Sequence, residues 1–356
     1  MAVFSGMLGA DESLFRDSVA LDYDYIPKVI PFREGQQKAI ADCIKPLFQK
    51  RNGKNVVITG SPGIGKTVAL RKILNELEES SDEITPIYIN CWQNNSTFKI
   101  FLAMCDALSY KFTQNKRSDE LFKIIKSAVN KKSAVFVFDE VDKIEEYDFL
   151  YSILEEIYRK TIILISNRKD WLSNLDPRVK SRLIPETIEF LPYTQDETKS
   201  ILKERMKFSF IDNAWEDSAF DIVAEKAYKL EDVRIGLYLL RESGNIAESN
   251  SSKRITKDYA LKAIEKVKEY SLNEKEDLQD DNKLVLDIIK EKSGEKIGDL
   301  FKIYEERGGS GSYKTFTRRI KDLEDGKFIA TEKKTGSEGN TTIVKYSDVS
   351  RKLTDF

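Results

Sequence analysis

Residues 60–67 have the types and the spacing of a loop that binds phosphate groups. The pattern reads Gly-x-x-x-x-Gly-Lys-Thr and comprises Gly60, Ser61, Pro62, Gly63, Ile64, Gly65, Lys66 and Thr67. Glycines let backbone N–H groups wrap an anion, the lysine would reach the β- and γ-phosphates, and the threonine hydroxyl would hold Mg²⁺. We therefore expect a site for ATP or ADP with Mg²⁺. The alternative is a chance match, which would occur in about one chain in a hundred of this length.

Two carboxylates, Asp139 and Glu140, end an apolar run that begins at Ala134. Acids at the end of a buried strand cost free energy unless something there needs them. Beside a phosphate loop, Asp139 would hold the Mg²⁺ ion, directly or through water. Glu140 would orient and polarise the water that attacks the γ-phosphate. The alternative is a strand that merely ends in surface acids.

Three further polar residues could act on the same phosphate. Asn167 ends another apolar run and is placed to hydrogen-bond the attacking water or the γ-phosphate. Arg182 lies in a cationic turn and helix and could reach the γ-phosphate of a neighbouring subunit, where it would stabilise developing charge. Arg234 lies one turn into a helix at residues 231–241 and could reach back to the phosphates. Taken alone, the two arginines also fit a solvated basic helix and a salt bridge to Glu231.

Alternating strands and helices must position these residues. A β-branched run at residues 55–59 precedes the loop, and apolar residues at helical spacing follow it. A phosphate would then lie at a helix N-terminus, facing unpaired N–H groups. Further strands are expected at residues 85–91, 134–140, 161–167 and 188–192, and helices at 96–110 and 121–130. This order predicts an α/β core with a parallel sheet flanked by helices.

The rest of the chain is divided by composition. Residues 1–193 would form the nucleotide-binding core, and 194–270 are helical without strands, opening on a capping box. Residues 271–280 are polar, charged and without periodicity, which indicates a linker. Residues 281–356 follow the order helix, helix, turn, helix, hairpin, which is typical of a winged helix-turn-helix.

The third helix of this last unit would enter the major groove of duplex DNA, and the hairpin would lie along an adjacent groove or backbone. The candidate DNA contacts on that helix and on the hairpin stem are Tyr313, Lys314, Arg318, Arg319, Lys333 and Lys334. Winged helices also serve as protein-binding modules, and this alternative stays open.

Composition excludes several classes of function. A net charge of −2 on 356 residues argues against a uniformly basic nucleic-acid coat, so DNA contacts must come from local patches. The chain has no histidine, which excludes histidine general bases, Ser-His-Asp triads and histidine zinc sites. Three scattered cysteines, without a signal peptide or an apolar run of membrane-spanning length, indicate a cytoplasmic protein with core thiols.

These motifs in this order resemble the AAA+ ATPases, and within them the archaeal origin-recognition initiator family, relatives of the eukaryotic origin recognition complex. The closer likeness rests on residues 25–27, 31–34, 89–91 with the inserted helix that follows, 177–182 and the C-terminal winged helix. It extends from about Leu14 to Tyr346. Two departures are Phe32, where a histidine is expected, and Glu338 at a hairpin tip that carries no arginine.

The resemblance implies an AAA+ core, an all-α lid and a winged helix-turn-helix. It implies an ATP-bound protein, associated with the nucleoid, that binds duplex DNA at replication origins, assembles with other initiator subunits and helps load the replicative helicase. Slow ATP hydrolysis would act as a switch, with Arg182 as the finger in trans and Arg234 as the lid sensor. The inserted helix would also touch DNA, with Thr97 and Lys99 as candidates. The alternative is an AAA+ regulatory ATPase whose winged helix binds protein.

Overall fold

The computed structural model describes residues 13–144, 146–276, 280–309, 311–325, 328–336 and 339–347. The chain divides into two compact units, Met1–Ala260 and Leu261–Phe356. The expected core and residues 194–260 of the expected helical lid therefore lie in one unit, and residues 261–270 belong to the other. None of the helices in the described ranges is both long enough and apolar enough to cross a membrane.

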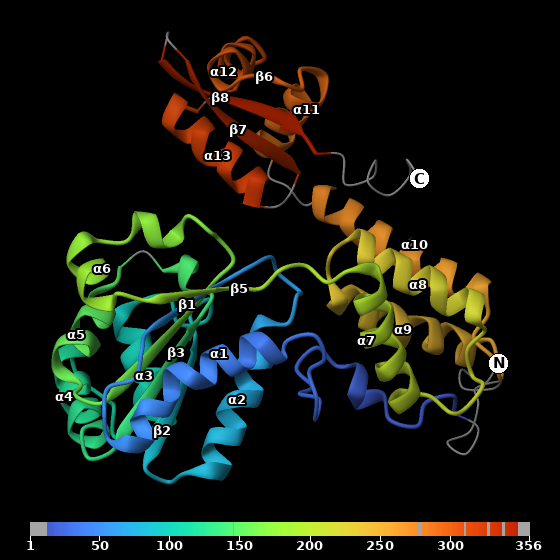
Figure 1. Ribbon diagram of the computed structural model, residues 1–356. Coiled ribbons are helices and arrows are strands. Elements are labelled where there is room, and N and C mark those ends of the chain that lie inside the picture. The colour runs from blue at the N-terminus through green and yellow to red at the C-terminus, as the bar shows by residue number, and fades with distance from the viewer. Residues whose placement is uncertain are drawn as a thin grey trace. The chain divides into compact units, whose positions relative to one another are not determined.

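A five-stranded parallel sheet forms the centre of the first unit (Figure 1). Its strands, in the spatial order β2-β3-β4-β1-β5, are Ile84–Asn90, Ser133–Asp139, Lys160–Ser166, Val56–Thr59 and Glu186–Glu189. The first four match the predicted strands within one or two residues. The last was predicted at 188–192, but it ends at Glu189, before the apolar pair Phe190 and Leu191. The predicted α/β core is confirmed.

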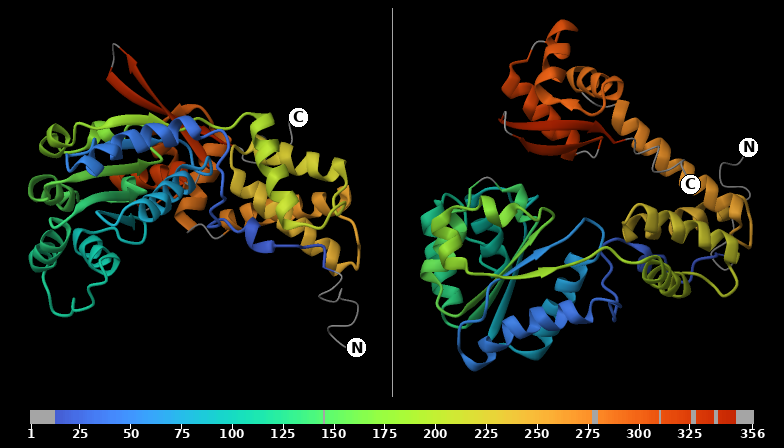
Figure 2. Two further views of the ribbon diagram at one scale, coloured as in Figure 1. Left: turned by 60° about the horizontal axis from the view of Figure 1, so that its bottom comes forward. Right: turned by 45° about the horizontal axis from the view of Figure 1, so that its top comes forward.

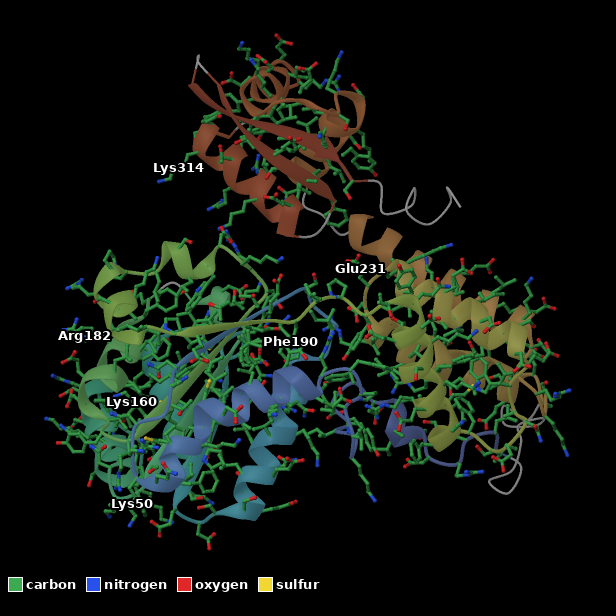
Figure 3. The ribbon with its side chains drawn as sticks, viewed as in Figure 1. Lys50, Lys160, Arg182, Phe190, Glu231 and Lys314 are labelled. Atoms are coloured by element: carbon green, nitrogen blue, oxygen red, sulfur yellow. The ribbon has the colours of Figure 1, made fainter. Side chains whose placement is uncertain are left out.

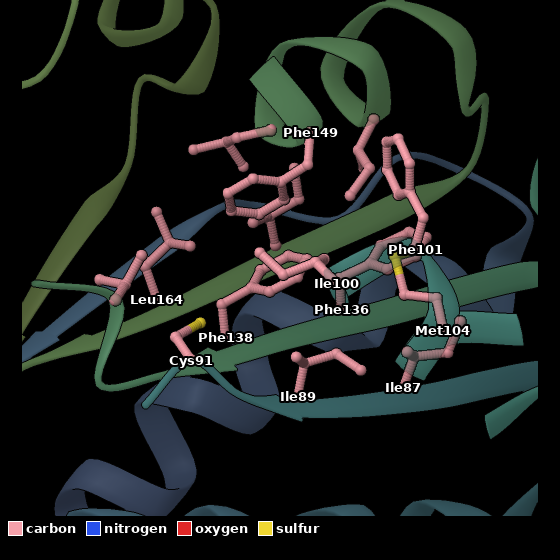
Figure 4. Packing of buried hydrophobic residues seen from close by; sticks show 14 of the residues in the cluster. Ile87, Ile89, Cys91, Ile100, Phe101, Met104, Phe136, Phe138, Phe149 and Leu164 are labelled. Atoms are coloured by element: carbon pink, nitrogen blue, oxygen red, sulfur yellow. The ribbon is translucent and has the colours of Figure 1, made fainter. Parts of the chain in front are cut away.

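Two apolar clusters cover the two faces of this sheet, because successive side chains of a strand point to opposite faces. Along β3, Phe136 and Phe138 belong to one cluster, whereas Val135 and Val137 belong to the other. Every residue of β3 is buried, as a parallel strand with helices on both faces requires. Figure 4 shows the first cluster, in which Phe149 lies 4.8 Å from the Phe138 ring, centroid to centroid.

Six α-helices belong to this core: α1 Glu34–Ile44, α2 Lys66–Ser80, α3 Thr97–Ala107, α4 Ser118–Val129, α5 Asp148–Glu156 and α6 Pro177–Leu183. Helices α3 and α4 begin and end close to the predicted limits. Helix α5 was not predicted. It has nine residues and only three buried ones, Phe149, Leu150 and Ile153, so its apolar periodicity is too short to detect.

Four helices follow the sheet: α7 Gln195–Ser209, α8 Asp217–Lys229, α9 Val233–Ser249 and α10 Lys257–Glu276. The predicted capping box is confirmed, since Thr194 and Glu197 each bond the other's backbone N–H. Two expectations were wrong. Helix α9 begins at Val233, so Glu231 lies before it with a φ of 53°. The expected linker is helical up to Glu276, because its Glu and Lys residues favour a helix as readily as a coil.

Beyond α10, which crosses the boundary between the units, the described part of the second unit has three helices and a small antiparallel sheet (Figure 2). The strand order in this sheet is β6-β8-β7. The elements are α11 Asp280–Glu291, β6 Glu295–Lys296, α12 Ile297–Glu306, α13 Tyr313–Asp325, β7 Ile329–Gly336 and β8 Gly339–Tyr346. Strands β7 and β8 pair from Ile329 opposite Tyr346 to Gly336 opposite Gly339. Their arrangement is consistent with the predicted winged helix-turn-helix. Glu338 lies outside the described residues.

Candidate functional site

The phosphate loop lies between β1 and α2, as predicted. Helix α2 begins at Lys66, and Gly65 precedes it with a φ of 91°. This left-handed conformation favours glycine. A Cβ atom added at Gly65 would also lie only 2.9 Å from the hydroxyl of Tyr193. The left-handed conformation and the close hydroxyl together explain why the motif has glycine at position 65.

Lys66 is held at the mouth of this loop. Its side chain is buried, and Nζ donates hydrogen bonds to the carbonyl oxygens of Gly60 and Ser61, both at 2.7 Å, and to Asn167 Oδ1 at 2.8 Å. Burial lowers the pKa of Lys66 to about 8. The structure therefore brings two predicted site residues from different segments, Lys66 and Asn167, into direct contact.

Asp139 ends β3 and connects three segments of the chain. Its Oδ2 atom accepts hydrogen bonds from Thr67 Oγ1 at 2.7 Å and from the Tyr88 hydroxyl at 2.8 Å. Its Oδ1 atom accepts from the backbone N–H of Glu140 at 2.9 Å. Thr67 and Asp139 were predicted as Mg²⁺ ligands, and their oxygens lie side by side. Tyr88 was not predicted.

Tyr88 lies on β2, which pairs in parallel with β3. The guanidinium carbon of Arg71 lies over the Tyr88 ring, 4.8 Å from the centroid. Burial, followed by the Asp139 charge, raises the pKa of the Tyr88 hydroxyl, so the hydroxyl remains a donor at neutral pH. The register of β2 on β3 pairs Asn90 with Asp139, which puts Tyr88 one side-chain repeat from the acid. This register belongs to the tertiary structure, so the sequence carried no local signal for Tyr88.

Replacing Tyr88 with phenylalanine should raise the Mg²⁺ concentration for half-maximal ATP binding by about tenfold, the usual size of an effect on residues that orient a metal ligand. The ring and its packing remain, and only the donor to Asp139 is lost. The measurement is a Mg²⁺ titration of ATP binding, with Tyr158→Phe, an exposed tyrosine, as the control. An unchanged Mg²⁺ requirement would contradict this role.

Glu140 follows β3 in a left-handed conformation, with φ 56° and ψ 40°, which is uncommon for a residue other than glycine. It is partly buried. Burial, and then the charges of Asp139 and Asp142, raise the pKa of its carboxyl. A base that is desolvated and close to a phosphate site is suited to accept a proton from water.

These residues line one cavity of about 890 Å³ in the first unit. Its wall includes the phosphate loop with Asp139, Glu140 and Asn167, the segment at residues 22–31, and side chains of α7 and α9. The sequence did not identify Arg205 of α7, whose guanidinium lies 4.7 Å from the Tyr25 ring. Arg205 also donates a hydrogen bond to the carbonyl of Ala20 at 3.1 Å, so it ties the helical part to the N-terminal segment.

The two predicted arginines lie in different places. Arg234 of α9 lines the cavity, where it forms an ion pair with Asp232. Arg182 of α6 is not among the residues that line the cavity of this unit. Its guanidinium forms an ion pair with Glu155 and lies 5.0 Å from the Tyr151 ring. Figure 3 labels Arg182.

The predicted DNA contacts differ in accessibility. On α13, Lys314 and Arg318 are exposed, whereas Arg319 is half-buried and donates to the Tyr304 hydroxyl (Figure 3 labels Lys314). Tyr313 packs edge-on against Phe301. Lys333 and Lys334 lie in β7 at positions whose side chains are outside the described residues.

On α3, Lys99 is exposed and its Nζ lies 3.3 Å from Asn95 Oδ1. The Thr97 hydroxyl is buried, and it has no hydrogen-bond partner within the described parts of the chain. This hydroxyl is therefore not presented to a ligand at the surface.

The residues of the cavity fit a nucleoside triphosphate with Mg²⁺. The volume is in the range of small-molecule sites. At Gly65 there is no room for a Cβ atom beside the Tyr193 hydroxyl. Thr67 and Asp139 offer adjacent hard oxygen ligands for the metal ion. Within the described ranges, no group of three or more cysteine, aspartate and glutamate side chains could hold a metal ion. An Mg²⁺ ion held by Thr67 and Asp139 would take its other ligands from water and phosphate oxygens.

Comparisons with known proteins agree with this geometry. Two family models match: an AAA domain at residues 49–169 and a Cdc6 AAA+ ATPase-type lid domain at residues 199–265. The ORC1-type DNA replication protein 1 of Sulfolobus acidocaldarius is 31% identical over 329 residues, which cover 87% of this chain and 83% of that protein. The ORC1-type DNA replication protein 2 of Methanothermobacter thermautotrophicus is 29% identical, with 94% of this chain and 92% of that protein covered.

Solved structures are similar in fold over the same span. The ORC1 protein of Aeropyrum pernix, in complex with DNA, superposes with a TM-score of 0.74 at 23% identity and covers 96% of both chains. The ORC2 protein of Aeropyrum pernix, in ADPNP–ADP complexes, has a TM-score of 0.68 at 18% identity and covers 94% of both chains. The likeness therefore includes the lid and the C-terminal unit as well as the sheet.

Proposed function

Because the chain belongs to the family of ORC1-type DNA replication proteins, we propose that it is an initiator that binds origin duplex DNA under the control of bound ATP. The observation that carries this proposal is that one chain holds two parts. The first is a nucleotide cavity, and the second is a C-terminal unit whose helix α13 exposes Lys314 and Arg318. The DNA in the Aeropyrum pernix ORC1 structure supports the same reading.

In the nucleotide cavity, Lys66 binds the phosphates, and Thr67 and Asp139 hold Mg²⁺. A bound Mg²⁺ ion neutralises phosphate charge as it develops. Glu140 and Asn167 orient the attacking water, and Arg234 senses the γ-phosphate from α9. Arg182 acts on the site of a neighbouring subunit, which fits its position outside its own cavity. Hydrolysis is then slow in the isolated chain, and the nucleotide acts as a switch.

The same proposal includes the later steps of initiation. The chain assembles with other initiator subunits on the DNA and helps to load the replicative helicase, at the nucleoid in the cytoplasm. The Drosophila ORC structure bound to DNA, with a TM-score of 0.58, supports a multi-subunit assembly of this fold.

Charge reversal on α13 tests DNA binding. The Lys314→Glu, Arg318→Glu variant should bind duplex DNA at least about tenfold more weakly than the unchanged chain. The slope of log affinity against log salt should fall by about two, since each phosphate contact contributes about 0.9. The measurement is fluorescence anisotropy with duplex DNA from beside the chain's own gene and with scrambled duplex, across a salt series, with ATP and with ADP.

A matched control exists in the same unit. Lys290→Glu with Lys302→Glu makes the same change of net charge at two exposed lysines of α11 and α12, which pair with Asp287 and Asp299. This control should keep the affinity and the salt slope. Equal losses in both variants, or none in either, would contradict DNA binding through α13, and an unchanged slope would favour a protein partner for this unit.

A further inference from the structure

Asp232 and Arg234 form a closed ion pair at the start of α9. The guanidinium Nε atom lies 3.0 Å from Oδ1 and 3.2 Å from Oδ2 of the carboxylate, and Nη2 lies 2.6 Å from Oδ2. Asp232 also caps the helix by accepting a hydrogen bond from the backbone N–H of Arg234 at 2.9 Å. A fork of charge-assisted hydrogen bonds is stronger than a neutral contact, so the arginine is occupied by its own neighbour.

The same carboxylate lies against the phosphate loop. A Cβ atom added at Gly63 would come within 2.1 Å of Asp232 Oδ1, and the backbone N–H of Val233 donates to the Gly63 carbonyl at 3.3 Å. Gly63 has a φ of 76°, so both its conformation and its neighbour require glycine. A negative charge from α9 is therefore packed onto the loop that would bind a negative ligand.

Arg234 also lines the same cavity as Lys66 and Glu140. Those two residues are the ones expected at the γ-phosphate. A third phosphate would compete with Asp232 for the guanidinium, whereas a diphosphate would leave the pair closed.

We propose that Asp232 is a specificity-determining residue of the nucleotide site, because its carboxylate holds Arg234 and opposes the γ-phosphate at Gly63. This inference rests on the proposed nucleotide binding. Asp232 then limits the preference for ATP over ADP. When ATP binds, Arg234 leaves Asp232 and contacts the γ-phosphate instead.

The chain contains a matched control for this arrangement. Asp176 caps α6, accepts from the backbone N–H of Arg178 at 2.7 Å and forms an ion pair with its guanidinium at 3.3 Å. This Asp-x-Arg pair has the same local chemistry, but neither residue lines the cavity.

Asp232→Asn keeps an N-cap acceptor and removes the charge. We expect the ratio of Kd for ADP to Kd for ATP to rise about fivefold, the worth of one partly exposed ion pair. Asp176→Asn should leave the ratio unchanged. In an Arg234→Gln background the ratio of Kd for ADP to Kd for ATP should be lower than in the unchanged chain. Adding Asp232→Asn should then raise that ratio by less than fivefold, because only the repulsion at Gly63 is left to relieve. Calorimetric titration of the full chain with each nucleotide measures the ratio in all four variants.

Asp232→Ser, which also caps a helix, should move the ratio in the same direction and guards against a folding defect in the asparagine variant. A ratio that stays constant in both Asp232 variants, or that rises equally in Asp176→Asn, overturns the inference while leaving nucleotide binding intact. A full chain that binds neither ATP nor ADP overturns the proposed function itself, and the inference with it.

Discussion

Lys66→Met is expected to abolish ATP binding, with an affinity loss of at least about 100-fold, and at the same time to stabilise the nucleotide-free protein. The loss follows from removing the only cation that lies inside the phosphate loop of the described site. The gain follows from burial. Lys66 is 6% exposed, and burial lowers its pKa from 10.5 to about 8, so the fold disfavours its charge.

The expected size comes from the same shift. At 1.36 kcal/mol per pKa unit, the charge costs about 3 kcal/mol. The hydrogen bonds that Nζ donates to the loop and to Asn167 offset part of this cost, which leaves a net gain in the free energy of unfolding of about 2 kcal/mol. Function and stability thus oppose each other at this residue.

The pH dependence has a definite sign. Below pH 8 the lysine is charged in both the folded and the unfolded state, and the cost is fully present. Between pH 8 and 10.5 the folded state loses the proton first, so the unfolded state binds more protons and the stability of the unchanged protein rises with pH. The difference in unfolding free energy between Lys66→Met and the unchanged chain should therefore shrink across this window.

Tryptophan fluorescence can follow this unfolding, because all three tryptophans, Trp92, Trp171 and Trp215, lie in the first unit. Lys72→Met is the matched control, since Lys72 is on the same helix and pairs with Glu76 at 3.1 Å. It should bind ATP normally and gain no stability. A Lys66→Met protein that unfolds at the same or lower denaturant concentration at pH 7 would show that burial does not penalise this charge.

Two of the site residues that the sequence predicted lie at the ends of parallel strands. Asp139 ends β3, and Asn167 follows β4. Strand β4 pairs with β1, whose end carries the phosphate loop, and β3 pairs with β4. Carboxyl ends of parallel strands meet at one edge of a sheet, so composition and spacing were sufficient to bring them together. The 2.8 Å contact between Lys66 and Asn167 is the structural outcome.

The residues it missed act through contacts between segments that have no local spacing signal. Tyr88 reaches Asp139 only because of the register of β2 on β3. Asp232 could not be told from Glu231 in the sequence, since both are acids just before an apolar helix. The backbone separates them: Glu231 has a positive φ and lies outside the helix, whereas Asp232 caps it. Such caps set where a helix begins. The apolar pattern alone locates the first residue of a helix only to within about a turn.

Glu140→Gln should lower ATP hydrolysis by about 10²–10⁴-fold while ATP binding persists, because the amide cannot accept a proton from water. Arg182→Ala should also keep binding and should lower hydrolysis by about 10³–10⁵-fold in an assembly that needs an arginine in trans. Single-turnover hydrolysis of bound ATP in the presence of duplex DNA measures both. Arg178→Ala, one turn earlier on α6 and also at the surface, is the control and should hydrolyse ATP normally.

A mixture of the two inactive variants decides where Arg182 acts. The Arg182→Ala chain keeps a complete site with Glu140, and the Glu140→Gln chain keeps a complete arginine. If the arginine serves a neighbouring subunit, mixed assemblies contain interfaces with both groups, and hydrolysis reappears on mixing. If it serves its own site, every site in the mixture lacks one group, and the mixture stays as inactive as its components. Since Arg182 pairs with Glu155 outside the cavity of its own unit, we expect hydrolysis to reappear.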